Sequence, residues 1–536
     1  MILPIIIDIM PQVEAPLITE FYRALDMQKR CGGAIVAQEE YFNSPSTFSE
    51  KGRIEAQNDG FLLQRYFDVP SEKDLELITP YAIPKKLFDE IIYTSGSYTD
   101  AMHSLVTQGY EPLEEWLSLV IEDIYAKRNE LPSCFLTTRD LASVKNVAQK
   151  FDIPIFYYEW ASFREPVYSF KAHLDTAGVN LTAGTEERFN QFCKELKTYP
   201  KSLLTAKEIL ALTLQPKYMK LLSLYDTEPS YEVGVVLGIR NVPIMTNVAF
   251  NHPSNYDSLR LAIDNFQNNE ILIRSNPNNP DRNIIANAGL PIDGSETAAE
   301  FIIKCRRTIA IASNMTFETM LWNRSAFSFG QGLCRSQCME KIDSTVKNPD
   351  IRFLNFMSFA FYIPFEWVYN EEYLMWRINE KPSEIEIYQK HLEYVLSCLE
   401  LDIKILNFGV DVRLGEILQQ LGFDINGFPI LTQQTDYGQN IMNIMQEWKS
   451  TELSKREEKL FSLLLHNIYH KSHLEASMHQ EISRANALII SMEKAKKLST
   501  RIKLWVKRFL PYSLYSSLVK LKRSIFGPHD VGDIDL

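Results

Sequence analysis

Short apolar runs alternate with amphipathic stretches over the first 225 or so residues. The runs are bounded by turn residues, and the segment from Pro112 to Arg128 has the apolar spacing of a helix lying on a core. This alternation predicts βαβ units around a parallel sheet. The apolar runs that we expect to form buried strands are residues 2–10, 133–140 and 153–160.

A second block repeats this pattern further along the chain. Four β-rich runs with helical stretches between them predict a second doubly wound domain. Two such domains imply a cleft between them. The four runs are residues 231–239, 269–280, 306–314 and 325–332.

The rest of the chain divides into three segments. An aromatic-rich mixed segment is expected to pack back on the first domain, and a polar segment without Gly or Pro over some fifty residues predicts a long helix or helical hairpin that can self-associate as a coiled coil. The predicted fold is thus α/β, with two Rossmann-like doubly wound domains facing a cleft and a helical extension at the C-terminal end. The boundaries are 1–228 and 229–345 for the two domains, 346–440 for the mixed segment, 441–493 for the helical segment and 494–536 for the tail.

Composition excludes several classes of protein. The chain has 536 residues, of which 45% are hydrophobic and 23% charged, as in an ordered globular protein. A net charge of -12 argues against a general nucleic-acid binder. Seven scattered cysteines suit a reducing compartment, and no stretch of about 18 apolar residues predicts a membrane span. We therefore expect a cytoplasmic protein.

The tail reverses the charge of the body. The stretch from Lys494 to Arg523 holds basic residues and no acidic one, and Leu498, Trp505 and Phe509 fall on one helical stripe. An apolar stripe flanked by cations is typical of an interfacial helix on anionic lipid. We expect residues 494–526 to bind an anionic membrane surface, the alternative being a helix docked on the protein's own acidic surface.

The stretch 306–332 is the most informative for chemistry. A predicted strand ends at Ser313 and Asn314, a helix opens with Thr316 and Glu318, and a further strand ends at Gly330. Small polar residues at a helix N-terminus leave backbone N–H groups available for phosphate, and Glu318 is then placed to accept bonds from a ribose. The alternative interpretation is ordinary N-capping.

This pattern resembles the second domain of the bacterial capsule and lipopolysaccharide Kdo transferases, a capsule polysaccharide biosynthesis family with GT-B architecture. The resemblance implies a glycosyltransferase that moves Kdo from CMP-Kdo onto a lipid-linked cell-surface glycan, peripherally at the bacterial inner membrane. Where the family has a strand ending in His-Pro, this chain has Asn276 and Pro277. Asn276 carries no charge, so Arg274 is expected to supply part of the attraction for the nucleotide phosphate.

The resemblance also bears on the first strand of the second domain. The family has a Gln and then an Asp there, and the implied mechanism is a retaining transfer in which that Asp attacks the sugar. Here Gly238 stands near the Gln and Asn241 near the Asp, with Arg240 between them. A neutral amide cannot attack in the same way, and the nearest carboxylates are Glu232 and Asp257.

The first domain offers a candidate acid/base. Glu159 lies at the C-terminal end of a predicted parallel strand, where ligands collect in doubly wound sheets, and Arg164 is placed to pair with a sugar carboxylate. The alternative is a surface ion pair between the two. Asp175 and Asn180 resemble a family turn that lines the cleft, or form a turn with its own side-chain bonds.

The spacing of the remaining cysteine, histidine and glycine residues does not support metal binding, ATP hydrolysis or nicotinamide chemistry. Cys334 and Cys338 lack a matching pair of ligands, His466, His470 and His473 read as a polar helix face, and no P-loop or GxGxxG motif follows a strand. We expect no metal, no further cofactor and no nucleic-acid partner. Two alternatives to the Kdo transferase stay open: a GT-B transferase that uses another nucleotide sugar, and a catalytically degenerate scaffold subunit of surface-polysaccharide assembly.

Overall fold

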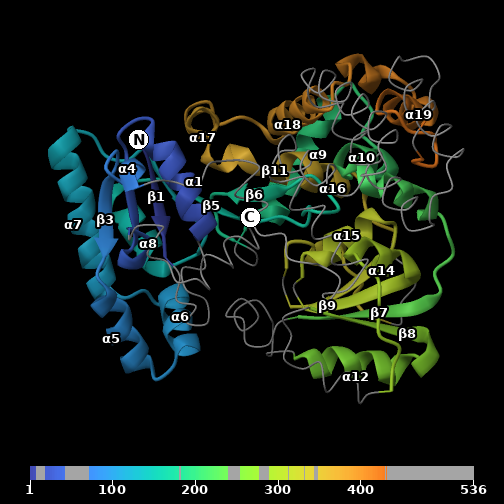
Figure 1. Ribbon diagram of the computed structural model, residues 1–536, viewed down its shortest axis with the longest axis horizontal. Coiled ribbons are helices and arrows are strands. Elements are labelled where there is room, and N and C mark those ends of the chain that lie inside the picture. The colour runs from blue at the N-terminus through green and yellow to red at the C-terminus, as the bar shows by residue number, and fades with distance from the viewer. Residues whose placement is uncertain are drawn as a thin grey trace, which may run out of the picture. The chain divides into compact units, whose positions relative to one another are not determined.

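The computed structural model in Figure 1 places most of the chain before residue 431. The predictions for residues 441–493 and 494–536 therefore lie outside the described residues. No helix in the described part is both long and apolar enough to cross a membrane. The structure describes residues 1–7, 18–42, 72–179, 183–238, 254–276, 289–311, 313–330, 332–342, 348–428 and 430.

The N-terminal sheet has a parallel, doubly wound centre in the order β3-β2-β1-β4-β5. The predicted strands are present as β1 (Ile2–Ile6), β4 (Cys134–Thr137) and β5 (Ile155–Trp160). The structure adds β2 (Ala34–Gln38) and β3 (Thr79–Ile83), which the sequence pattern did not reveal. Pro80 cannot donate to a sheet ladder, so β3 is confined to the edge of the sheet, where the structure has it.

Two antiparallel strands complete this sheet on the other side. β6 (Lys171–Asp175) pairs antiparallel with β5, and β11 (Tyr362–Pro364) pairs antiparallel with β6. The strand β11 comes from the aromatic-rich segment, so that segment completes a sheet begun far earlier in the chain.

The predicted helix near Pro112 is α7 (Glu111–Arg128), which has Pro at its start and ends at Asn129 in the left-handed conformation. Its buried face packs in one core with the strands of the N-terminal sheet. The other helical elements of this part are α1 (Ile18–Lys29), η1 (Glu39–Phe42), α4 (Glu72–Leu75), α5 (Lys85–Ser95), α6 (Tyr98–Thr107) and α8 (Ala142–Phe151).

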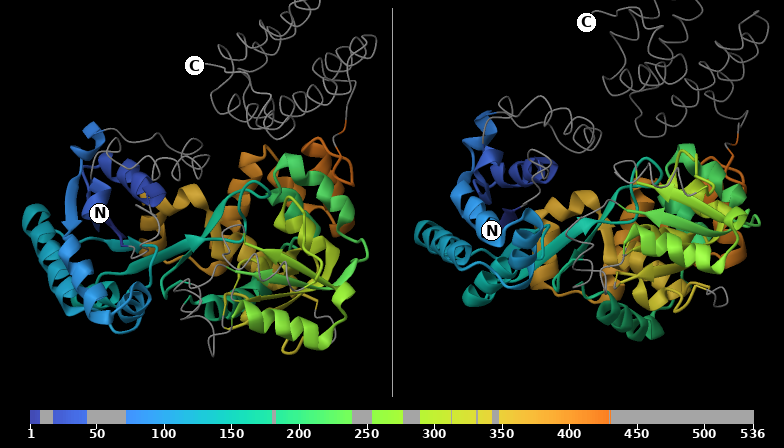
Figure 2. Two further views of the ribbon diagram at one scale, coloured as in Figure 1. Left: turned by 60° about the horizontal axis from the view of Figure 1, so that its bottom comes forward. Right: turned by 90° about the horizontal axis from the view of Figure 1, so that it is seen from below.

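The second sheet is entirely parallel, in the order β10-β9-β7-β8. All four predicted strands are present, and alternate residues along β7 enter separate cores: Val235 joins one with α12, and Val236 joins the other with α14 and α15. These helices lie on opposite faces of the green-to-yellow sheet (Figures 1 and 2). The elements are β7 (Tyr231–Leu237), α12 (Asn255–Asn265), η6 (Asn268–Glu270), β8 (Ile271–Ser275), α14 (Ala298–Lys304), β9 (Cys305–Ile311), α15 (Met315–Leu321), β10 (Ser325–Phe329) and η7 (Arg335–Gln337).

The α/β fold with two doubly wound sheets is therefore confirmed. One hydrophobic core joins residues 161–225 and 353–423 to one face of the second sheet, and so runs across residue 228. Its helical elements are α9 (Thr185–Glu195), η4 (Leu196–Thr198), α10 (Ala206–Thr213), η5 (Pro216–Leu224), α16 (Ile351–Asn355), η8 (Phe356–Phe361), η9 (Phe365–Tyr369), α17 (Glu371–Asn379), α18 (Glu384–Cys398), η10 (Ile403–Asn407) and α19 (Val410–Gln420).

A fully buried ion pair ties α10 to α19. The Arg413 guanidinium donates to both carboxylate oxygens of Glu208 at 2.6 and 2.9 Å and to the carbonyl oxygens of Ser202 and Leu203. Both side chains are fully buried. The hydrogen bonds offset the cost of removing both charges from water, and the loss of one partner leaves the other uncompensated.

We predict that Arg413→Ala lowers the free energy of unfolding by about 3–5 kcal/mol, because Glu208 is then a buried charge without its partner. Urea unfolding followed by circular dichroism measures this loss. The matched control is Arg352→Ala, which removes a half-exposed arginine paired with Asp350 and should cost under about 1 kcal/mol. Equal losses in the two variants would contradict the importance of the buried pair.

Candidate active site

The loops that follow β5 and β9 meet at the carboxyl ends of the two sheets. The Ser162 hydroxyl donates to the Asn314 carbonyl at 2.9 Å, and the Asn314 side-chain amide donates to the Trp160 carbonyl at 3.1 Å. Phe163 packs edge-on against Phe317 with ring centroids 5.6 Å apart. Because ligands of doubly wound sheets bind at the carboxyl ends of strands, this junction brings two candidate ligand edges together.

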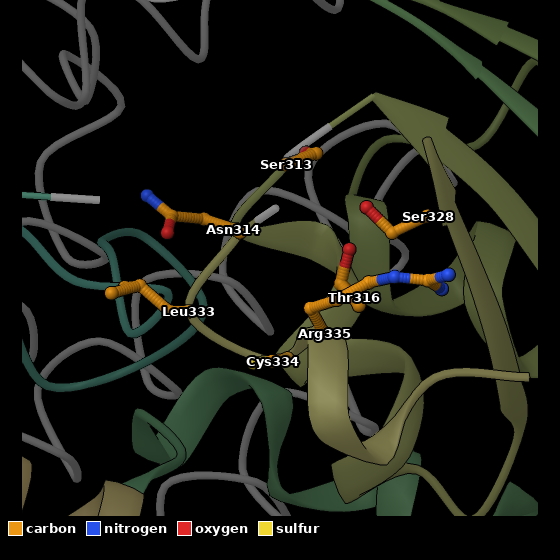
Figure 3. A pocket seen from close by; sticks show the side chains of 8 residues that line it. Ser313, Asn314, Thr316, Ser328, Leu333, Cys334 and Arg335 are labelled. Carbon is orange, nitrogen blue, oxygen red and sulfur yellow. The ribbon is translucent and has the colours of Figure 1, made fainter. Parts of the chain in front are cut away.

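A small pocket opens beside this junction (Figure 3). The hydroxyls of Thr316 and Ser328 and the side chain of Arg335 gather around the same space. Thr316 is 3% exposed, and its hydroxyl has no hydrogen-bond partner among the described residues. The pocket is lined by Ser313, Asn314, Thr316, Ser328, Gly332, Leu333, Cys334 and Arg335.

Arg335 is the cation of this pocket, and sequence reasoning missed it. It lies on η7, after a turn that carries no recognisable motif, and it donates a long hydrogen bond of 3.4 Å to the Met339 carbonyl. A guanidinium beside two hydroxyls suits an anionic group such as phosphate. Gly330, which ends β10 with φ of 80°, supplies the left-handed turn before the pocket.

Arg274 has a different partner from the one that we expected. Its guanidinium pairs with Asp293 at 2.5 Å and donates to the Ser295 carbonyl, and the Asp293 carboxylate is fully buried. Its charge is therefore compensated within the protein instead of being directed at a ligand. Asn276 follows β8 and donates its backbone N–H to the Leu237 carbonyl.

Glu318 lies behind the pocket and does not line it. Its carboxyl is hydrogen-bonded to the Tyr168 hydroxyl, which also accepts the Trp322 indole N–H at 2.8 Å. Burial raises the pKa of Glu318 to about 7, against the opposing effect of the Arg164 guanidinium. The structure thus has Glu318 as a buried acid bonded within the protein, and its contact with a ribose stays a prediction.

Glu232 is removed from the site by the direction of its strand. It lies near the start of β7, at the amino edge of the sheet, and pairs with Arg306 at 3.1 Å. Asp257 is equally local, because it forms a capping box with Ser254 at the start of α12. Both carboxylates therefore have partners within the protein, and a catalytic role for Glu232 stays a prediction.

Gly238 lies at the carboxyl end of β7, as the prediction requires. Its backbone N–H and carbonyl both bond to the Asn255 side chain at 3.1 Å, which fixes the peptide at the site edge. The remaining predicted residues of this region, Arg240, Asn241 and Pro277, lie outside the described residues, as does Asn180.

Glu159 lies at the carboxyl end of β5 with Arg139, not Arg164, as its ionic partner. The distance between the Arg139 guanidinium and the Glu159 carboxylate is 3.6 Å, and each side chain is 21% exposed. Arg164 donates to the carbonyls of Ala161 and Trp160. No carboxylate pairs with Arg164 in the described part of the chain, so the surface ion pair with Glu159 does not form.

A second carboxyl that the sequence analysis missed lies beside Glu159. Glu20, in the first turn of α1, accepts the Trp160 indole N–H at 3.1 Å. Burial raises the pKa of Glu20 to about 7, and the negative charge of Glu159 acts in the same direction. An acid in the first turn of the helix after the first strand is the one sequence signal that was present. Such acids are too common to identify a functional site.

Asp175 fits the turn interpretation. Its buried carboxylate accepts the backbone N–H groups of Ala177 and Gly184 at 2.7 and 3.1 Å and pairs with Arg188 at 3.0 Å. Arg188 also pairs with Glu384 of α18. These bonds anchor β6 and its following turn to the core.

The cysteines and other metal-binding residue types form no cluster of three or more within the described residues. Cys334 and Cys338 are buried, and the Cys338 thiol donates to the Cys334 carbonyl at 3.3 Å. Burial raises the pKa of the Cys334 thiol well above its usual range.

Residues 9–186 match the glycosyltransferase 99 family N-terminal domain. The chain is a glycosyltransferase. The matched region contains β5 and α1, and hence both Glu159 and Glu20. A search of curated proteins finds no match.

Solved structures with some likeness to this chain include two of KpsC. KpsC of Thermosulfurimonas dismutans, as a β-Kdo 2,7 transferase, shares 13% identity over 46% of this chain and 81% of its own, with a TM-score of 0.30. The β-Kdo 2,4 transferase of the same protein shares 13% identity over 41% and 78%, with a TM-score of 0.24.

A UDP-GlcNAc 2-epimerase of Methanocaldococcus jannaschii, solved with UDP-GlcNAc and UDP, shares 12% identity over 66% of this chain and 97% of its own, with a TM-score of 0.27. At this level of similarity, neither the sugars nor the nucleotides of these proteins transfer to the present one.

We predict that Glu318→Gln gains stability relative to the parent as the pH rises from 5 to 8. The unfolded chain ionises this carboxyl near pH 4.5 and the folded chain only near pH 7, so ionisation favours unfolding across that interval. Glutamine does not titrate, and the difference in unfolding free energy should shift by on the order of 2 kcal/mol.

Urea unfolding of both proteins at several pH values measures this difference. The matched control is Glu386→Gln, whose parent carboxyl has its pKa lowered by hydrogen bonds from Ser383, so that its effect should stay nearly constant between pH 5 and 8. A difference for Glu318→Gln that is equally flat would show that Glu318 is ionised throughout.

Proposed function

We propose that this glycosyltransferase moves Kdo from CMP-Kdo onto a lipid-linked cell-surface glycan. The observation that supports the proposal most directly is the position of the Arg335 pocket. It lies beside the contact between Ser162 and Asn314, which links it to the end of β5 where Glu159 lies. The pocket supplies an anion site and the end of β5 supplies a carboxylate base. These are the two groups that transfer from a nucleotide sugar to a hydroxyl requires.

The donor phosphate is assigned to the pocket. A CMP-sugar releases a nucleoside monophosphate, whose single phosphate matches one guanidinium and the hydroxyls of Thr316 and Ser328. The buried Thr316 hydroxyl supports this assignment, because a buried polar group without a partner is costly and a ligand oxygen would satisfy it.

The acceptor is assigned to the carboxyl ends of the parallel strands of the N-terminal sheet, where Glu159 lies. Glu159 takes the proton of the acceptor hydroxyl, and the acceptor oxygen forms a bond to the anomeric carbon of the sugar. The bond between that carbon and the phosphate oxygen breaks, and CMP leaves with the bonding electrons. Arg164, which no described carboxylate neutralises, is available for the carboxylate of an acidic sugar. This cation is what favours Kdo over a neutral sugar.

We expect CMP to raise the melting temperature of the protein more than UDP, GDP or ADP, because a ligand that binds only the folded state stabilises it. Arg335→Ala should weaken CMP binding by about 10- to 100-fold, the usual effect of losing a charge-assisted bond. Thermal denaturation across a series of nucleotide concentrations gives both results.

The matched control is Arg306→Ala, which removes an arginine from the amino edge of the same sheet and should leave CMP binding intact. Preference for another nucleotide would keep the transferase and discard CMP-Kdo. No shift with any nucleotide would favour a scaffold subunit that has lost catalysis.

The membrane contact belongs to the same proposal. A lipid-linked acceptor lies at a bilayer surface, and residues 494–526 combine cations with an apolar stripe suited to anionic lipid. Residues 441–493 are proposed to associate as helices between copies of the chain.

The full chain should pellet with phosphatidylglycerol vesicles, and a variant that lacks residues 494–536 should not, since each basic residue contributes about 1 kcal/mol near an anionic surface. Vesicles of phosphatidylcholine alone are the control for charge. Unchanged pelleting of the shortened protein would assign the lipid contact elsewhere.

A further inference from the structure

Two carboxyl side chains from separate elements lie close together at the carboxyl ends of the parallel strands of the N-terminal sheet. Glu20 comes from α1 and Glu159 from β5. Trp160 connects them: its indole N–H donates to the Glu20 carboxyl at 3.1 Å, and its backbone N–H donates to the Glu159 carboxylate at 3.0 Å. One residue thus sets the position of both acids.

The surroundings of the two carboxyls differ. Glu20 is 4% exposed, whereas the Glu159 side chain is 21% exposed and has the Arg139 guanidinium 3.6 Å away. Burial disfavours the charged form of an acid, and a neighbouring cation favours it. The surroundings of Glu20 therefore disfavour its charged form, against the opposing effect of Arg139, whereas Glu159 is directly paired with that cation.

The other groups facing Glu20 keep this division. The hydroxyls of Tyr158 and Tyr369 are hydrogen-bonded to each other, and burial holds the pKa of both phenols well above the usual range, so neither brings a negative charge. The Arg23 guanidinium, on the same helix as Glu20, lies 4.5 Å from the centre of the Phe365 ring.

We propose that Glu20 is a positioning residue that acts in its protonated form and thereby holds Glu159 in place as the general base. The inference rests on the proposed function of Glu159 and adds a second carboxyl to it. Pairs of acids whose environments separate their protonation states are a recurring way to assign one base.

The neutral state of Glu20 has two consequences for the reaction. A neutral Glu20 does not repel the Glu159 carboxylate, which keeps the position set by the Trp160 backbone N–H and can accept the hydroxyl proton. It also adds no negative charge against a sugar that carries a carboxylate. Ionisation of Glu20 at higher pH reverses both effects, and transfer declines.

The test is the pH dependence of transfer by the full chain with CMP-Kdo as donor, read as release of CMP in the presence of acceptor glycan. In the parent, kcat/KM should fall by about tenfold from pH 6 to pH 8, the change in protonated fraction of a group with a pKa of about 7. In Glu20→Gln, which keeps a neutral side chain at every pH, this decline should disappear.

Two further variants separate the possible failures. Glu20→Ala removes the acceptor of the Trp160 indole bond and should lower kcat at all pH values, which a neutral Gln should largely rescue. Glu159→Gln should lose transfer by about 100-fold or more at every pH, while CMP still raises its melting temperature.

A Glu20→Gln profile that declines as in the parent, with Glu159→Gln inactive, would overturn the role of Glu20 and leave the proposed function intact. Full activity of Glu159→Gln would instead refute the assignment of the base. Melting temperatures of all the variants show that each is folded, so loss of structure is not mistaken for loss of the pair.

Discussion

The contact between the loop after β5 and the turn after β9 is the constraint on which the site depends. Two hydrogen bonds close it: the Ser162 hydroxyl donates to the Asn314 carbonyl, and the Asn314 side-chain amide donates to the Trp160 carbonyl. Phe163 and Phe317 make the apolar part of the same contact. Because Trp160 also bonds to Glu20 and Glu159, the Arg335 pocket and the acid pair share one junction.

Burial, more than direct ion pairing, sets the electrostatics around this junction. Glu20 lies on α1 and Glu318 on α15, helices that pack on different sheets, yet burial raises the pKa of each to about 7. The arginines divide accordingly: Arg274 is compensated by the buried Asp293, whereas Arg335 faces the pocket. Among the described residues, packing therefore leaves the Arg335 guanidinium, and not that of Arg274, beside a pocket.

The strands β1, β4 and β5, the second sheet and α7 could be predicted because apolar periodicity records burial directly, whereas the parallel β2 and β3 were missed. The antiparallel β6 and β11 were missed as well, and β11 pairs with β6 across nearly 190 residues of chain. Glu159 was placed correctly at a strand end. Arg335 and Glu20 have no motif, and the misplaced Glu232 shows that proximity in sequence does not tell which end of a strand faces a ligand.

The origin of β11 has a consequence for synthesis of the protein. The N-terminal sheet cannot be completed until Tyr362–Pro364 has left the ribosome, and the core that Tyr362 enters draws on residues up to 423. Domains that are contiguous in sequence can fold one after another as they emerge. Here the strands made first must wait, with β6 unpaired on one side, and a nascent chain stalled before residue 362 would present that edge to chaperones or to other chains.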